Sequence, residues 1–236
     1  MRPTKIFIPC LVLLVLSVNG YAQKKSRKDE LITLETSQGT MRLILFEETP
    51  KHRANFLKLV EDKFYDGLLF HRVIDDFMIQ GGDPDSRGAE AGKLLGRGDN
   101  GYKIPAEFSP NLFHQKGALA AARDNNPKKE SSGCQFYLVQ GHKWSAGDLD
   151  KQQARAARKF TDNQRKIYQE IGGTPHLDGS YTVFGQVIDG LAVIDKISSQ
   201  TRDSRDRPET DITMKISAKK MNKKKISRKY GYKYDD

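Results

Sequence analysis

Residues 70–83 read FHRVIDDFMIQGGD, and this stretch carries the strongest signal in the chain. Arg72 and Gln80 stand among apolar and aromatic residues, and the run ends at two glycines and Asp83. Arginine is permanently charged and presents a rigid fork of donors. The pattern therefore predicts a strand beside an apolar pocket with one fixed cationic donor, which suits an apolar ligand that carries an acceptor. The alternative is that Arg72 lies on an edge strand or forms a structural ion pair.

Two further segments follow this run along the chain. Residues 117–123 read GALAAAR, with SGCQFY at 132–137, and residues 176–187 read HLDGSYTVFGQV. In this order the three segments closely resemble the signature of the cyclophilins, the peptidyl-prolyl cis-trans isomerases, and the resemblance covers residues 31–218. It implies an all-β dominated fold, a closed eight-stranded antiparallel barrel capped by two helices. Many short predicted strands and glycine-rich turns also favour a closed barrel.

The resemblance also implies a reaction and a site. The reaction is rotation about an X-Pro peptide bond, which makes no covalent intermediate and requires no cofactor or metal. Arg72 matches the catalytic arginine of the family, and Gln80 matches the residue that orients it. The implied substrate-binding residues are His71, Phe77, Met78, Ala122, Arg123, Gln135, Tyr137, His176, Leu177 and Tyr181.

Four of these residues depart from the types that are frequent in the family. Tyr137 stands for phenylalanine, Arg123 for asparagine, His176 for tryptophan and Tyr181 for histidine. The Tyr137 ring can still pack, but its hydroxyl needs a partner. The five histidines of the chain are far apart in sequence and lack close ligand spacing, so no metal site is predicted.

Residues 142–173 form an insertion relative to the short form of the family. Thr161 to Gln164 matches a capping box, which predicts that one or two helices form there. The insertion is either a packed surface elaboration or a flap that selects substrates. Outside it, the pattern predicts one helix starting at Thr49-Pro50 and another over residues 191–197.

The two ends of the chain differ in composition from the middle. Residues 1–22 combine a positive start, an apolar run and small residues at 20 and 22, which predicts a signal peptide cleaved after Ala22; a membrane anchor is the alternative. Residues 23–30 are predicted to be a basic linker. Residues 219–236 are predicted to be a basic, solvated tail that makes weak contact with polyanions or a membrane surface. After cleavage Cys134 is the single cysteine, so no internal disulfide is possible.

The predicted function is that of an exported isomerase, periplasmic or secreted, which assists the folding of exported proteins. Its predicted partners are proline-containing peptides and unfolded exported proteins, and nucleic acid is not expected. A non-catalytic peptide-binding or chaperone module with the same barrel is the alternative, and the presence of Arg72, Phe77, Met78 and Gln80 favours the enzyme. A polyanion-binding protein is a third possibility that rests on the tail charge within a net charge of +10.

Overall fold

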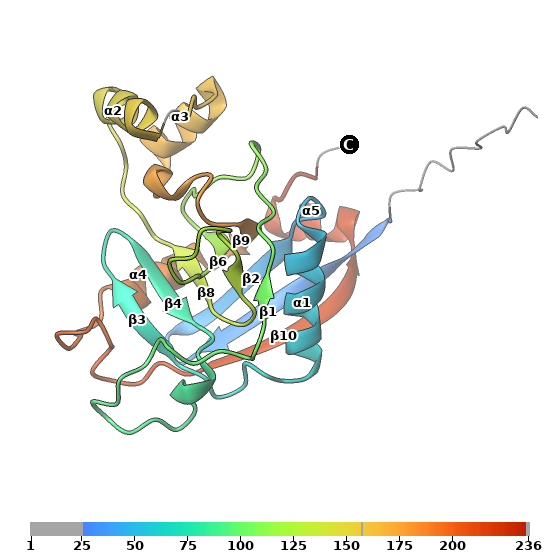
Figure 1. Ribbon diagram of the computed structural model, residues 1–236. Coiled ribbons are helices and arrows are strands. Elements are labelled where there is room, and N and C mark those ends of the chain that lie inside the picture. The colour runs from blue at the N-terminus through green and yellow to red at the C-terminus, as the bar shows by residue number, and fades with distance from the viewer. Residues whose placement is uncertain (1–25, 157, 235–236) are drawn as a thin grey trace, which may run out of the picture.

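The computed structural model describes residues 26–156 and 158–234. The predicted signal peptide, residues 1–22, lies outside them. Eight strands form one antiparallel sheet in the order β10-β1-β2-β9-β6-β8-β4-β3 (Figure 1). Their bounds are β1 Lys28–Thr36, β2 Gly39–Leu45, β3 Phe70–Ile74, β4 Met78–Gly81, β6 Ala118–Ala121, β8 Phe136–Val139, β9 Val183–Asp189 and β10 Met214–Asn222. Two short strands, β5 (Lys103–Ile104) and β7 (Ser131–Ser132), form a separate pair.

The eight-stranded sheet is open and curled, a half-barrel, so the prediction of a closed barrel was wrong. Its two edges are β3 and β10, and they approach at an isolated bridge between Leu69 and Thr213. The segment before β10 turns back on itself through a bridge between Arg202 and Pro208. Scattered backbone bonds reach β3 from this segment, from Phe70 N–H to the Ile212 carbonyl and from Val73 N–H to the Asp206 carbonyl, but β3 and β10 share no ladder.

Two helices pack against the sheet, as predicted. They are α1 (Pro50–Glu61) and α4 (Leu191–Ser198). Phe56 of α1 meets Phe136 of β8 edge to face at 5.7 Å between ring centroids, and Ile194 and Ile197 of α4 are fully buried. Burial of these apolar faces in one core is the main force that holds the helices to the sheet.

The insertion forms two helices, α2 (Ala146–Ala156) and α3 (Asp162–Glu170), which stand away from the sheet in Figure 1. The predicted capping box is present: the Gln164 amide accepts from Thr161 N–H, and the Thr161 hydroxyl accepts from Gln164 N–H. The helices have a small core of their own, made of Phe113, Leu149, Phe160 and Tyr168. Two short 3-10 helices, η1 (Pro84–Ser86) and η2 (Pro175–Leu177), complete the elements around the site.

Both ends of the described chain are more ordered than the sequence suggested. Strand β1 begins at Lys28 inside the predicted linker, and its buried Asp29 pairs with Arg53 at 2.9 Å. Strand β10 reaches Asn222, and helix α5 (Lys223–Tyr230) follows with Ile226 fully buried. The prediction of a solvated tail over 219–236 was therefore wrong for residues 219–230, which form the end of β10 and helix α5. Burial of the Ile226 side chain stabilises the contact of this basic helix with the rest of the protein, and a count of charges along the sequence does not reveal it.

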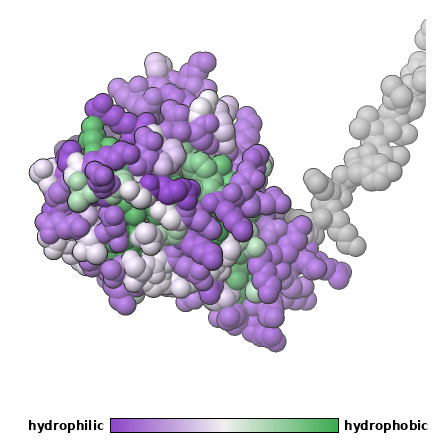
Figure 2. All heavy atoms as spheres, turned by 90° about the horizontal axis from the view of Figure 1, so that it is seen from below, coloured by the Kyte–Doolittle hydropathy of each residue, from purple (hydrophilic) through white to green (hydrophobic). Residues whose placement is uncertain are grey.

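The face of the molecule shown in Figure 2 is mostly hydrophilic, with small apolar patches. Within residues 26–156 and 158–234, no helix is long and apolar enough to cross a bilayer. The same residues contain no group of histidine, cysteine or acidic side chains that could hold a metal ion. Contact of the basic α5 surface with polyanions or a membrane stays a prediction.

Candidate functional site

A cavity of about 120 Å³ opens on the outer face of the sheet. Nine of the twelve predicted site residues line it: Arg72, Phe77, Met78, Gln80, Ala122, Arg123, Tyr137, Leu177 and Tyr181. The other three, His71, Gln135 and His176, lie beside these residues and support them, as described below. The structure therefore brings together residues that are more than 100 positions apart in the sequence.

The alternation of side chains along the strands builds this cavity. In β4, Ile79 belongs to the inner core while Met78 faces the outer apolar cluster. In β8, Leu138 points inward and Tyr137 outward. Successive strand residues face opposite sides of a sheet, so short strands with apolar residues on both faces produce an inner core and an outer pocket together.

Arg72 lies at the rim of the cavity and is directly opposite Gln80 across the β3–β4 ladder. Its Nη1 donates to Gln80 Oε1 at 3.4 Å, and its Nε is 3.8 Å from Asp206 Oδ2. The side chain is 40% exposed, so the guanidinium can reach a ligand. Arg72 therefore forms a long ion pair with Asp206, as one alternative from the sequence suggested, and it also lines the pocket.

Gln80 is held by a chain of amide contacts. Its Nε2 donates to Gln135 Oε1 at 3.0 Å, and Gln135 Nε2 donates to the Gly98 carbonyl at 2.7 Å. Gln135 is buried, so its side chain orients Gln80 from behind rather than lining the cavity. Because the buried Gln135 amide has hydrogen-bond partners at both its oxygen and its nitrogen, it holds the Gln80 side chain in place, with the Gln80 oxygen toward Arg72.

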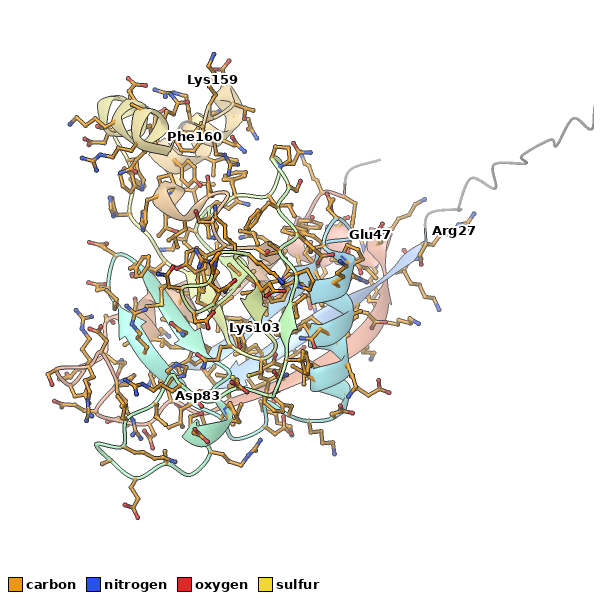
Figure 3. All side chains as sticks on the ribbon, viewed as in Figure 1. Arg27, Glu47, Asp83, Lys103, Lys159 and Phe160 are labelled. Atoms are coloured by element: carbon orange, nitrogen blue, oxygen red, sulfur yellow. The ribbon has the colours of Figure 1, made fainter. Side chains whose placement is uncertain are left out.

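The two glycines at the end of β4, Gly81 within the strand and Gly82 after it, allow the chain to pass close to its neighbour. Gly82 has φ +89°, and a Cβ there would lie 2.4 Å from the Cys134 carbonyl oxygen. Asp83 follows (Figure 3), fully buried, and accepts hydrogen bonds from the N–H groups of Asp85 and Gly96. The end of the 70–83 run therefore anchors the loop over residues 84–98, which borders the site.

The Tyr137 ring forms the floor of the cavity, and its hydroxyl has the partner that the sequence required. His114 Nε2 is 3.0 Å from the Tyr137 hydroxyl, and His114 Nδ1 is 2.7 Å from Asp178 Oδ1. The hydroxyl of Tyr168, on α3, donates to Asp178 Oδ2 at 2.8 Å. Burial raises the pKa of Tyr137 well above its usual value, so its hydroxyl stays neutral. This buried chain connects the insertion to the pocket floor.

Sequence reasoning did not identify His114, Asp178 or Tyr168. The one available signal was Tyr137, whose hydroxyl had to find a partner inside the protein. Trp144 was missed as well. Its ring stacks on that of His142, with 4.5 Å between ring centroids, and its centroid lies 6.4 Å from that of His176. The His176 ring in turn stacks on Phe77, at 5.7 Å between centroids. His176 thus supports the Phe77 wall from outside the cavity.

Replacing Tyr168 with phenylalanine should lower the free energy of unfolding by about 1–3 kcal/mol, because it removes a buried donor to the Asp178 carboxylate. Urea unfolding measures this change. Tyr102→Phe is the matched control, since that ring is 45% exposed and its hydroxyl bonds to Asn55 at the surface. Equal losses in the two variants would show that the buried chain does not stabilise the fold.

His71 lies behind Arg72 and is 4% exposed. Neither ring nitrogen has a partner that meets strict hydrogen-bond geometry among the described residues. Burial lowers the pKa of His71 from 6.5 to about 4; nearby Asp83 opposes this shift, Arg72 adds to it, and the nearby Leu69 backbone, which favours the charged ring, slightly opposes it. The ring is therefore neutral at physiological pH.

This lowered pKa predicts a loss of stability in acid. Between about pH 6.5 and 4 the unfolded chain binds a proton at His71 that the folded chain does not. The free energy of unfolding should then fall as the pH falls through that range, by up to about 1.4 kcal/mol per pH unit from this group. The test compares urea unfolding of the parent and of His71→Leu at pH 7 and pH 5. A variant that loses as much stability as the parent would contradict the prediction.

Comparison with known proteins gives matches over most of the chain. The model of the family described as "Cyclophilin type peptidyl-prolyl cis-trans isomerase/CLD" matches residues 31–218. A putative peptidyl-prolyl cis-trans isomerase of Staphylococcus aureus (strain USA300) is 36% identical over 184 residues, which cover 78% of this chain and 88% of that protein. A putative bifunctional phosphatase/peptidyl-prolyl cis-trans isomerase of Streptococcus pyogenes serotype M6 is 37% identical over 184 residues, 77% of this chain and 37% of that longer protein.

Solved structures share the fold. A cyclophilin type peptidyl-prolyl cis-trans isomerase from Cryptosporidium parvum superposes with a TM-score of 0.59 at 23% identity, covering 81% of this chain and 98% of that one. A second structure of that protein, in the presence of the dipeptide Ala-Pro, gives a TM-score of 0.58 at 23% identity and covers 80% of this chain and 98% of that one.

Proposed function

We propose, since this chain belongs to the cyclophilin-type peptidyl-prolyl cis-trans isomerases, that it accelerates X-Pro rotation through Arg72 acting on the proline nitrogen. The observation that carries the proposal is a partly exposed guanidinium, positioned by Gln80, at the rim of an apolar cavity. A proline ring suits the walls formed by Phe77, Met78 and Leu177. A cyclophilin with the same fold has been studied in the presence of Ala-Pro, which supports a proline-containing ligand here.

The chemistry follows from the electronic structure of the amide. Resonance sets a barrier of roughly 18–20 kcal/mol to rotation of the peptide bond. As the bond twists, conjugation is lost and the proline nitrogen gains a lone pair that can accept a hydrogen bond. A fixed donor aimed at this nitrogen binds the twisted form more strongly than the planar form, which lowers the barrier. No bond is made or broken, so no nucleophile takes part.

The size of the effect sets the role of the other residues. A hydrogen bond from a charged donor is worth about 1.5–3 kcal/mol. A ten-thousandfold acceleration requires about 5.4 kcal/mol, at 1.36 kcal/mol per decade. The difference has to come from the walls, which hold the ring and the preceding carbonyl in a twisted geometry with water excluded. The Tyr137 floor and the Phe77 wall therefore contribute to catalysis by their shape.

We further propose that the natural substrates are exported proteins during folding. The charged start, apolar run and small residues within positions 1–22 support this role. Mass spectrometry of the protein isolated from its native host should then detect a mature chain that starts at Gln23. A full-length chain retained in the membrane fraction would favour the membrane anchor instead.

The activity itself is tested with a short capped proline peptide in a protease-coupled isomerisation assay. The full mature chain should accelerate the slow cis-to-trans phase in proportion to enzyme concentration. A folded protein that binds the peptide without accelerating this phase would instead be a peptide-binding module. Circular dichroism of the same sample establishes that it is folded.

A further inference from the structure

A second cavity, of about 340 Å³, adjoins the proposed proline pocket. Arg72, Gln80 and Arg123 line both cavities, so the two are neighbours that share these side chains. The remaining wall comes from His71 and from two loops that the sequence motifs do not include, at residues 93–96 and 203–207. Five lining residues are cationic and one is acidic: Arg72, Lys93, Arg123, Arg205 and Arg207, with Asp203.

Three of the five cations face a carboxylate. Arg207 is structural, because its side chain is 8% exposed, pairs with Asp211 at 2.9 Å and donates to the backbone carbonyls of residues 89 and 90. Arg72 faces Asp206 at 3.8 Å. Arg205 faces Asp203 at 3.8 Å; its side chain is 48% exposed. The last two pairs are long and solvated, so they neutralise their arginines weakly.

The other two cations are oriented by backbone groups. Lys93 Nζ donates to the Asp85 carbonyl at 3.1 Å. Arg123 donates to the carbonyls of Ser180 and Asp124, both at 2.9 Å, and its guanidinium lies 4.7 Å from the Tyr181 ring centroid. Among the described residues, no ion pair joins Lys93 or Arg123 to a carboxylate. The charges of Lys93 and Arg123 are therefore not neutralised by a carboxylate, and the walls of the second cavity carry net positive charge beside the neutral His71 ring.

We propose that this cavity is a subsite for an acidic side chain of the substrate, within three residues of the proline. This inference rests on the proposed function, since it names the substrate class of the same site. A peptide whose proline occupies the first cavity enters the second where it continues past Arg72 or Arg123, because both residues border the two cavities. A carboxylate there gains charge-assisted hydrogen bonds, and a recess lined by cations also attracts anionic chains from solution.

The test uses capped peptides, acetylated and amidated, so that one side chain carries the whole charge. Glutamate and glutamine are compared at each of the three positions on either side of the proline. At one position or more, the ratio of kcat/KM for glutamate over glutamine should be about three- to tenfold at low salt, because the free cations are partly solvated. The ratio should fall as salt rises, since screening weakens exposed charge pairs.

Variants locate the recognition in the cavity. Arg205→Gln removes a charge but keeps a donor for the Gly92 carbonyl, which Arg205 binds at 2.7 Å. Lys93→Gln likewise removes a charge at the other loop and keeps a donor for the Asp85 carbonyl. Each single variant, and the double variant, should bring the glutamate-to-glutamine ratio of kcat/KM toward one. Arg228→Gln, on an exposed position of α5 away from the site, is the matched control and should keep the ratio.

The outcomes separate this inference from the function on which it rests. Turnover of the glutamine peptides with a ratio near one at every position overturns the subsite and leaves the isomerase intact. A ratio that persists in the double variant also overturns it, because the recognition then lies elsewhere. Absence of turnover for all peptides, charged or neutral, contradicts the proposed function itself.

Discussion

Replacing Arg72 with alanine is expected to lower kcat/KM for a short proline peptide by about 10- to 100-fold or more, because a charge-assisted hydrogen bond to the twisted amide is lost. The fold should persist, since the side chain is 40% exposed and its contacts to Gln80 and Asp206 are long. The protease-coupled assay measures the rate, and urea unfolding measures the stability of the same preparation.

Two controls define what the loss means. Arg202→Ala removes the neighbouring arginine that binds Asp206 at 3.3 Å, so it tests whether the loop alone matters. It should keep most of the activity. Arg72→Lys retains the positive charge but loses the planar fork of donors. Its kcat/KM should lie between that of Arg72→Ala and that of the parent protein. Unchanged turnover in Arg72→Ala would exclude the mechanism proposed here.

Replacing Ile226 with alanine is expected to lower the free energy of unfolding by about 2–5 kcal/mol, because a fully buried aliphatic side chain leaves a cavity behind. For a domain of this size, that is a fall in Tm of several degrees. Helix α5 is further held by the Lys223 N–H bond to the Arg27 carbonyl and by the ion pair from Lys223 to Glu47 at 2.8 Å. Urea and thermal unfolding measure the change.

Lys225→Ala is the matched control on the same helix, at an exposed position one residue away. It should alter stability by less than about 0.5 kcal/mol. If both variants change the free energy of unfolding by equally small amounts, α5 is not packed against the protein, and the prediction of a solvated tail would be correct after all. Isomerase activity should survive at low temperature in Ile226→Ala, because none of the residues that line the proposed pocket belongs to α5.

Local sequence was enough to place the run at 70–83, helices α1 and α4 and the capped helix α3, because their signals lie between neighbours along the chain. The run from Phe70 to Asp83 forms β3, a turn and β4, and the glycines end it where close backbone approach excludes a side chain. The capping box at Thr161 formed as predicted, since both of its partners lie within four residues. Nine of the twelve site residues implied by the motifs line the cavity, and strand alternation aims four of them, Arg72, Met78, Gln80 and Tyr137, at this face.

Long-range contacts decided the rest. The sheet stayed open because the turn-rich segment before β10 does not form a full ladder with β3, which no strand pattern reveals. Gln135 and His176 became supports rather than lining residues because of where their neighbours lie.

The sequence by itself therefore determined the family, the strands of the 70–83 run and the group formed by Arg72 with Phe77 and Met78, since these depend on residue type and local periodicity. Only the tertiary structure decided that α3 supports the Tyr137 floor through Asp178 and His114, that Ile226 anchors the basic helix, and that two distant loops surround Arg72 with further cations. The physical reason is that hydrogen bonds, burial and charge act between residues close in space, whatever their separation along the chain.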